Sequence, residues 1–206
     1  MSTITTSLPS IRRASPDDLD LTAALLADAF QDDPVFAWCV PDPGRRRRVL
    51  PAFFRLVGGT VARYDEIFLA GDGAAMWVPP GEPAVPEPAA EAFETGLVEL
   101  FGADAERTFE VVALLEEHHP HADHHYLWFL GVAARQQGRG VGSHLLAHVL
   151  ATADRTGTPA YLEATSEHNR RLYERHGFEV VGELATSGSP PLWAMWRQPA
   201  PEPARH

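Results

Sequence analysis

The chain has 206 residues, 45% of them hydrophobic, and a formal net charge of −11 at pH 7. This length and apolar content predict a single domain with a full hydrophobic core, at about residues 10–198 between disordered tails at 1–9 and 199–206. The negative charge argues against a nucleic-acid-binding protein, because phosphate backbones are bound by clustered Lys and Arg side chains.

The sequence shows neither a membrane-helix pattern nor a signal-peptide pattern. No apolar run approaches the roughly 20 residues that a membrane helix needs, and residues 1–8 lack the basic-then-apolar plan of a signal peptide. Cys39 is the only cysteine, so no internal disulfide can form and a reducing compartment is favoured. We therefore expect a cytoplasmic protein without a nucleic-acid or membrane partner.

The first half of the chain is predicted to be mainly helical, with one hairpin. Ser15 is typical of a helix N-cap, and Leu21, Leu25, Leu26 and Phe30 are spaced as the apolar face of the helix that follows. In chain order we expect a strand at 10–13, a helix at 15–30, a Pro-punctuated link at 31–44, a helix at about 45–64, a hairpin of strands 67–70 and 75–78 around an Asp72–Gly73 turn, a Pro-rich link, and two helices within 89–117 broken near Gly102.

The second half has the alternation of strands and helices that is typical of a mixed α/β sheet. The helices are expected to stop at glycines, which favour the left-handed conformation after a helix end. The predicted elements are strands at 124–133, 159–165, 178–184 and 192–198, with helices at 142–157 and 168–177.

Three glycines, Gly138, Gly140 and Gly142, stand where the strand at 124–133 gives way to the next helix. Unpaired amides and the helix dipole make such a position an anion site, and glycines let a phosphate approach the main chain. No Lys-Ser or Lys-Thr pair follows, so this is not a P-loop, and the spacing is not the G-x-G-x-x-G of a dinucleotide site. The pattern indicates another phosphate-bearing ligand, or a tight turn without one.

The loop reads Q-x-x-G-x-G at 137–142, and "NRRLYERHGF" begins at Asn169. Together these resemble the GNAT superfamily of acetyl-CoA-dependent N-acetyltransferases. The resemblance implies an α/β fold whose central mixed sheet is splayed between two parallel strands, with a CoA-binding core at about 124–183. Within that superfamily, "YLWFLGVAARQQGRGVGS", "YLEATSEHNRRLYERHGF" and "LWAMWRQPA" look like the puromycin N-acetyltransferase group, with departures mainly between Arg45 and His125, where acceptor specificity is usually set.

The resemblance also implies roles for individual residues. The loop amides would hold the CoA pyrophosphate, the preceding strand would pair with the pantetheine arm, and the Val132 amide would stabilise the oxyanion. Tyr173 would protonate the departing thiolate. The implied cofactor-binding residues are Leu130, Gly131, Val132, Gln137, Gly138, Arg139, Gly140, Val141, Gly142, Ser143, Asn169 and Tyr173.

Acetyl transfer to an amine also needs a base to deprotonate the nucleophile. Glu163 is a candidate, because an unpaired carboxylate in an otherwise apolar strand is expensive unless it faces a cleft or a partner. A salt bridge from Glu163 to Arg170 or Arg171 is the structural alternative, and an ordered water is an alternative base. For Tyr173 the alternative is a core position beside Phe178.

The segment "DDPVFAW" supplies candidate acceptor-site residues. Carboxylates with aromatic faces suit a cationic amine, which makes Asp33, Phe36 and Trp38 candidates for its wall. The alternative assigns Asp33 to helix capping and the two aromatic residues to the core.

Two further clusters are conspicuous. Five histidines between His118 and His125 invite a metal hypothesis, but their spacings match no common zinc site, so we expect no metal. His125 is also a spare candidate base. The run Arg45–Arg48 is expected to be solvated or paired with acids, with the CoA 3′-phosphate as an alternative contact.

These observations predict an enzyme that transfers the acetyl group of acetyl-CoA to a primary amine of a small molecule. Acetylation of a protein lysine or N-terminus is an alternative within the enzyme class. A CoA-binding sensor without catalysis is an alternative outside it, and a homodimer is one state that such a chain could adopt.

Overall fold

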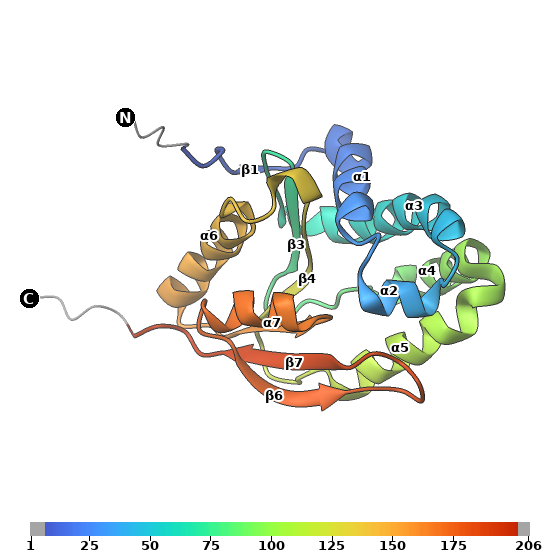
Figure 1. Cartoon of the computed structure of the whole chain (residues 1–206). Helices are drawn as coiled ribbons and strands as arrows, with labels where there is room; N and C mark the ends of the chain where they lie inside the picture. The colour runs from blue at the N-terminus through green and yellow to red at the C-terminus, as the bar shows by residue number, and fades with distance from the viewer. Residues whose placement is uncertain (1–6, 202–206) are drawn as a thin grey trace, which may run out of the picture.

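A mixed sheet of seven strands organises the computed structural model, which describes residues 7–201 (Figure 1). The strand order is β1-β2-β3-β4-β5-β7-β6, with β4 and β5 parallel and every other neighbouring pair antiparallel. This confirms the predicted α/β class, while the predicted tails fall mainly outside the described residues. The strands are β1 (Arg12–Arg13), β2 (Ile67–Ala70), β3 (Gly73–Val78), β4 (His125–Val132), β5 (Ala160–Ala164), β6 (Glu179–Leu184) and β7 (Leu192–Arg197).

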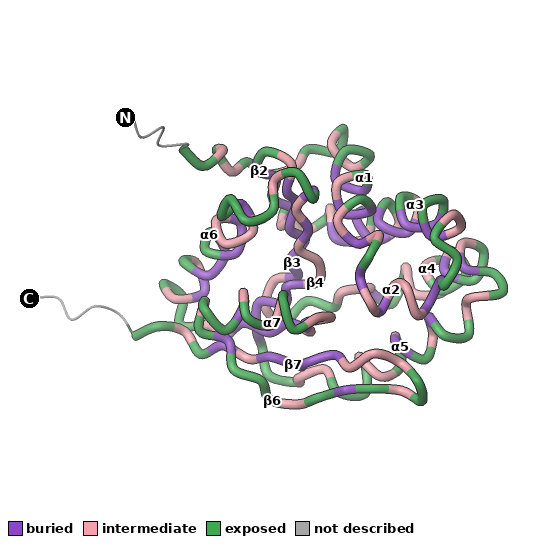
Figure 2. The backbone as a smooth tube through the Cα atoms, viewed as in Figure 1, coloured by how far each residue is buried: buried purple, intermediate pink, exposed green. Residues whose placement is uncertain are grey.

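Helices cover both faces of the sheet, and each face has its own hydrophobic cluster. One cluster joins α1, α3, α4 and α5 to the sheet, and the other joins α6 and α7 to it. Buried positions accordingly gather where α1, α3 and α6 face β3 and β4 (Figure 2). The helices are α1 (Leu19–Ala29), α2 (Pro34–Cys39), α3 (Pro43–Val61), α4 (Glu87–Phe101), α5 (Ala105–His118), α6 (Val141–Thr156) and α7 (Glu167–Glu174). None of the helices within residues 7–201 is long and apolar enough to cross a membrane.

Three local predictions need correction. The link expected at 31–44 contains α2, because Asp33 accepts hydrogen bonds from two amides of its first turn and Pro34 occupies the first helical position. The hairpin pairs Ala70 with Gly73, so its two-residue turn is Gly71–Asp72 and not Asp72–Gly73. Leu21, expected on the apolar face of α1, is 49% exposed.

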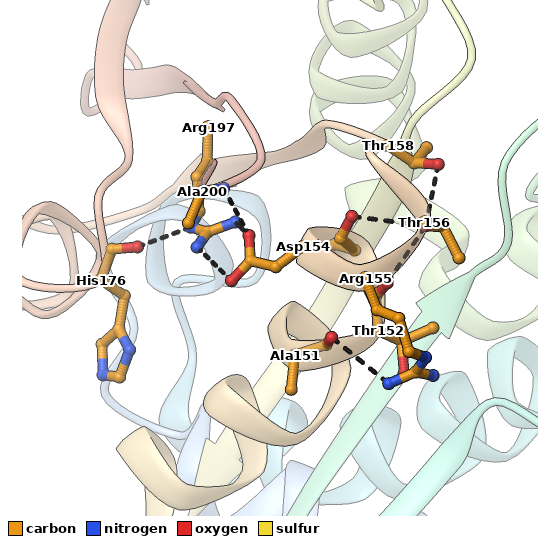
Figure 3. A network of polar contacts seen from close by, with 10 residues as sticks. Ala151, Thr152, Asp154, Arg155, Thr156, Thr158, His176, Arg197 and Ala200 are labelled. Carbon is orange, nitrogen blue, oxygen red and sulfur yellow. Dashed lines mark hydrogen bonds and ion pairs between the residues drawn. The ribbon is translucent and has the colours of Figure 1, made fainter. Parts of the chain in front are cut away.

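A network of hydrogen bonds connects β7 to α6 and to the turn after α7 (Figure 3). The Arg197 guanidinium donates two hydrogen bonds, of 2.7 and 2.9 Å, to the two carboxylate oxygens of Asp154 on α6. Its Nε donates a third, of 2.8 Å, to the carbonyl of His176, in the turn after α7. The amide of Ala200 donates to the same Asp154 carboxylate. One arginine thus links β7, α6 and the end of α7.

Candidate active site

The two parallel strands at the centre of the sheet separate soon after they meet. β4 and β5 pair only at His125 with Ala160 and at Tyr126 with Tyr161. At the far end of β4 the amide of Ala133 bonds to the carbonyl of Asp72, next to β3. Because backbone groups alternate sides along a strand, those of Val132 face away from β3. The opening between β4 and β5 is therefore lined by unpaired backbone of β4, where an extended ligand could add hydrogen bonds.

The pairing of β4 also shows which predicted contacts can reach this opening. The same alternation turns the backbone of Leu130 toward the opening and that of Gly131 toward β3. A Cβ at Gly131 would lie 2.8 Å from the Cβ of Ala29 and 2.9 Å from Leu26, so glycine is needed here for α1 to pack on the strand. The backbone of Leu130 and the Val132 amide thus face the opening and that of Gly131 does not, while the cofactor contacts of all three residues stay predictions.

A β-bulge in β4 directs two large aromatic side chains to one face. Met76 pairs with Phe129 and Trp77 pairs with Leu127, which leaves Trp128 without a partner. Trp128 and Phe129 both pack against the hydrophobic cluster on the α1–α5 side, whereas Leu127 belongs to the other cluster. The bulge thus puts adjacent aromatic residues on the same side of the sheet, beside the opening.

The predicted glycine loop lies at the end of β4 and leads into α6. Gly140 is the N-cap of α6 with φ +85°, and Gly138 has φ +71°, conformations that L side chains rarely adopt. The first intrahelical donor is the amide of His144, which bonds to the Gly140 carbonyl. The amides of Val141, Gly142 and Ser143 precede it and point out of the helix end. These amides and the helix dipole make the start of α6 suitable for an anionic group, and the CoA diphosphate stays the predicted one.

Gly142 differs from the other two loop glycines, since its φ is not positive. A Cβ there would meet only Val132 at 3.6 Å and Leu172 at 3.8 Å, which are ordinary contacts. The protein therefore has room for a side chain at this position, so the open space is available to a ligand. Gln137 ties the loop back to β4 by donating a 3.0 Å hydrogen bond from Nε2 to the Val132 carbonyl.

Asn169 and Tyr173 lie one helical turn apart on α7 and both line a cavity at the opening of the sheet. Ser166 caps the helix by accepting a hydrogen bond from the Asn169 amide. The Tyr173 ring is 7% exposed and packs edge-on against Phe178, with centroids 6.0 Å apart. Burial raises the pKa of its hydroxyl, and the Asp33 carboxylate raises it further. Tyr173 is both a core aromatic and a protonated hydroxyl at the cavity wall.

Glu163, on β5, lines the same cavity. Its Oε2 accepts a 2.8 Å hydrogen bond from the Tyr126 hydroxyl, while its buried Oε1 has no partner among the described residues. Burial raises the pKa of this carboxyl to about 7, with the Tyr126 and Tyr161 hydroxyls acting in the opposite direction. A carboxyl with that pKa and a free oxygen can exchange a proton near neutral pH.

The structural alternative for Glu163 does not hold. Arg170 pairs with Glu174 and Arg171 pairs with Glu167, each one turn along α7. Within residues 7–201, neither arginine forms an ion pair with Glu163.

The cavity occupies about 1110 Å³ between the opening of the sheet and the layer formed by α4 and α5. Its wall is mainly aromatic and aliphatic, with Glu163, Asn169 and Tyr173 on the sheet side. The phenylalanine and tryptophan residues of the lining come from five elements and the residue that follows α1; they are Phe30, Phe36, Phe53, Phe93, Phe101, Phe109, Trp128 and Phe129.

The three predicted acceptor-site residues, Asp33, Phe36 and Trp38, have different surroundings in the structure. Phe36 lines the cavity. Asp33, besides capping α2, accepts a hydrogen bond from the Thr165 hydroxyl at the end of β5. Trp38 is outside the lining, and its ring faces the guanidinium of Arg107 at 5.6 Å. The cationic group that contacts the Trp38 indole is thus the Arg107 guanidinium of the same chain.

The histidine cluster is packed among aromatic rings. His119 and His124 line the cavity, whereas His125, the spare candidate base, does not. Among residues 7–201 no three His, Cys, Asp or Glu side chains come together as a metal site. In the basic run, Arg45 pairs with Asp104 at 2.5 Å and the buried Arg46 donates to backbone carbonyls, so both have structural partners away from the glycine loop.

Sequence reasoning missed two residues of the site. Tyr126 holds Glu163, and Thr165 joins β5 to Asp33. The partners are separated by 37 and 132 positions respectively, so no local spacing could connect them.

Comparisons with known proteins agree with this geometry. Residues 76–178 match the model of the acetyltransferase (GNAT) family. The chain belongs to this family, whose members use acetyl-CoA. The match includes β4, the glycine loop, α6, Glu163 and Tyr173.

Individual relatives carry related names. An uncharacterized N-acetyltransferase of Schizosaccharomyces pombe is 27% identical over 93% of this chain and 84% of its own length. A solved Corynebacterium glutamicum protein, described as histone acetyltransferase HPA2 and related acetyltransferase, is 31% identical, covers 97% of this chain and all of its own, and has a TM-score of 0.71. Arylalkylamine N-acetyltransferase 2 of Aedes aegypti shares the fold, at 16% identity over 92% of this chain and 98% of its own, with a TM-score of 0.60. These findings establish the family and leave the likeness to the puromycin group as a prediction.

Proposed function

We propose that this acetyltransferase is a cytoplasmic enzyme that acetylates the primary amine of a small molecule. The observation that carries the proposal is the shared cavity of Glu163 and Tyr173. Both side chains line one aromatic-walled space at the point where β4 and β5 separate. Mostly apolar cavities with a few converging polar groups are typical of small-molecule sites.

Acetyl-CoA supplies an activated acetyl thioester when it is bound. The amides at the start of α6 would hold its diphosphate, and the unpaired backbone of Leu130 together with the Val132 amide would align the arm that carries the thioester. The Val132 amide is then positioned to donate to the thioester oxygen as it becomes negative.

Glu163 takes the proton from the acceptor's ammonium group, because its Oε1 is free and its pKa of about 7 leaves a large fraction ionised at neutral pH. The amine nitrogen then forms the new bond to the acetyl carbon. As the carbon–sulfur bond breaks, Tyr173 gives its proton to the sulfur. Its raised pKa keeps the hydroxyl protonated until that moment. The nitrogen loses its second proton as the amide forms, and this proton restores the Tyr173 hydroxyl through solvent. The products are the amide and the free thiol, and Glu163 releases the proton of the ammonium group to solvent.

A protein lysine or N-terminus is the competing acceptor. The name of the Corynebacterium relative favours it, and an acidic chain also attracts basic peptides. The mostly apolar wall that α4 and α5 add to the cavity favours the small molecule, because such walls with few polar groups are typical of small-molecule sites, whereas peptides are often bound through main-chain hydrogen bonds along a sheet edge.

The test is to measure CoA release with a panel of small amines and a panel of basic peptides, and to identify the products by mass spectrometry. We expect small-amine products with wild type and none with a Glu163→Gln, Tyr173→Phe double variant. The chain contains no lysine, so acetyl-lysine found in any reaction comes from the added peptide. Turnover of peptides alone would overturn the choice of acceptor. CoA binding without any product would support a sensor.

A further inference from the structure

The cavity has a charge pattern that acetyl transfer to a simple amine does not require. Its lining contains carboxylates and no arginine, and the sequence has no lysine. One carboxylate, Glu163, belongs to the reacting end. The other five are exposed and lie outside the sheet, namely Glu82, Glu87, Glu94, Glu116 and Asp123.

One face of α4 changes from apolar to acidic along its length. Phe101 and Leu97 are fully buried at one end of the cavity wall, whereas Glu94 and Glu87 are exposed toward the other end. Residues seven apart share a helix face and are separated by about 10 Å along the axis. The two carboxylates thus form an acidic strip on the wall, beyond the aromatic part.

The other acidic residues reach the same end from different segments. A Cβ at Gly81 would lie 3.6 Å from Oδ1 of Asp123, so the link after β3 meets the segment before β4. Glu82 follows Gly81 in that link and also lines the cavity. None of the five exposed acids forms an ion pair within residues 7–201, because every salt bridge there involves other residues.

A buried histidine beside Asp123 gives an independent sign of a ligand. His124 is 7% exposed and lines the cavity. Its Nδ1 lies 2.6 Å from the Ala122 carbonyl and must carry the proton of that hydrogen bond, since a carbonyl can only accept. Burial lowers the pKa of His124, so the ring is neutral and Nε2 is an acceptor, and this atom has no partner among the described residues. The Tyr161 hydroxyl, whose ring centroid lies 5.4 Å from that of His124, is also buried without a hydrogen-bond partner within residues 7–201, so this part of the cavity wall holds two polar groups whose hydrogen bonding a ligand can complete.

From these observations we propose that the acceptor is an elongated diamine, a conclusion that rests on the proposed small-molecule acetylation. Its reacting amine meets Glu163, and an apolar middle part lies against Trp128, Phe129 and Phe93. Its second cationic group sits at the acidic end, among the carboxylates of α4 and Asp123. A monoamine of the same shape leaves this acidic end unpaired.

The experiment compares two acceptors of nearly equal shape, 1,4-bis(aminomethyl)benzene and 4-ethylbenzylamine, with 1,8-diaminooctane and nonylamine as an aliphatic pair. We expect kcat/KM to be about tenfold higher for each diamine, mainly through KM, as two screened ion pairs would give. The advantage should shrink as the salt concentration rises.

Matched variants on α4 locate the effect. Glu87→Gln with Glu94→Gln should abolish the preference for diamines. Glu91→Gln with Glu99→Gln changes the same charge on the same helix at exposed positions outside the lining, and should retain it. Equal kcat/KM for both members of each pair would overturn the proposal and leave amine acetylation intact, as would equal losses in the two double variants. If no small amine is acetylated at all, the proposed function fails and this inference fails with it.

Discussion

Removing the Tyr126 hydroxyl while keeping its ring tests whether Glu163 is the base. The hydroxyl donates a 2.8 Å hydrogen bond to the carboxylate and stabilises its ionised form. A hydrogen bond to a charged group contributes about 1.5–3 kcal/mol, which corresponds to roughly 1–2 pKa units. In Tyr126→Phe the pKa of Glu163 should therefore rise from about 7 to roughly 8–9.

A base works in its ionised form, so this shift has a defined sign. The acid limb of the kcat/KM profile should move to higher pH, with turnover at pH 7 falling roughly tenfold and recovering toward wild type near pH 9.5. The assay is the pH dependence of kcat/KM for one accepted amine, with acetyl-CoA saturating. In a Glu163→Gln background the same Tyr126 change should move no limb. An unshifted limb in the single variant, or an equal shift in the double variant, would refute the assignment of Glu163.

Four further predictions use other parts of the molecule. Gly142→Ala should weaken CoA binding at least tenfold in calorimetry while keeping or slightly raising Tm, because a Cβ there meets no protein atom closer than 3.6 Å. Gly59→Ala is its control, since that helical glycine faces open space away from the loop, and it should leave CoA affinity unchanged. Tyr173→Phe should bind acetyl-CoA as wild type does and lose single-turnover acetylation by about 10²–10⁴-fold; an unchanged rate would return this residue to a purely structural role. Glu163→Gln should abolish the acid limb. The variant should also have a higher free energy of unfolding than wild type above pH 7. The raised pKa of Glu163 means that the wild-type fold loses stability as the pH rises toward about 7 and this carboxyl ionises, whereas glutamine stays neutral. A urea titration at pH 8 measures the difference. Asp154→Asn should lower the free energy of unfolding by about 2 kcal/mol at pH 7, because it leaves the nearly buried Arg197 with weaker hydrogen bonds. Urea titrations over a range of pH should show this difference from wild type vanishing at low pH, once the pH falls below the lowered pKa of Asp154.

The elements most accessible from the sequence were those defined by local chemistry. Gly157 ends α6 in the left-handed conformation, as a glycine after a helical pattern predicts. The loop glycines were recognised because a positive φ and an open helix end leave a pattern in adjacent residues. α2 was missed because it is only six residues long and is flanked by prolines, a pattern that equally indicates a link.

The side-chain environment of the site was less accessible, because the decisive contacts are non-local. For Asp33 the sequence left the acceptor wall and a helix cap as alternatives; it caps α2, and its further partner Thr165 comes from the other side of the chain's midpoint. Trp38 was chosen for its affinity for cations, but a stacked Arg107 on α5 already satisfies that affinity. The residue type indicates which groups a side chain can bind, whereas the fold determines which of these groups lies next to it.

The partial pairing of Glu163 is the strongest physical argument for function in this chain. Two tyrosines approach the carboxyl, yet one buried oxygen has no hydrogen bond from the described protein. Leaving such an atom unpaired destabilises a fold by about 1–3 kcal/mol, and an apolar residue at this strand position would remove that cost. Glu163 lines the cavity, so a ligand bound there can complete the hydrogen bonding of this carboxyl, beside the Tyr161 hydroxyl, which is also buried without a partner among the described residues. An ammonium group is a suitable partner, because it is positively charged and can donate a proton to the Glu163 carboxylate.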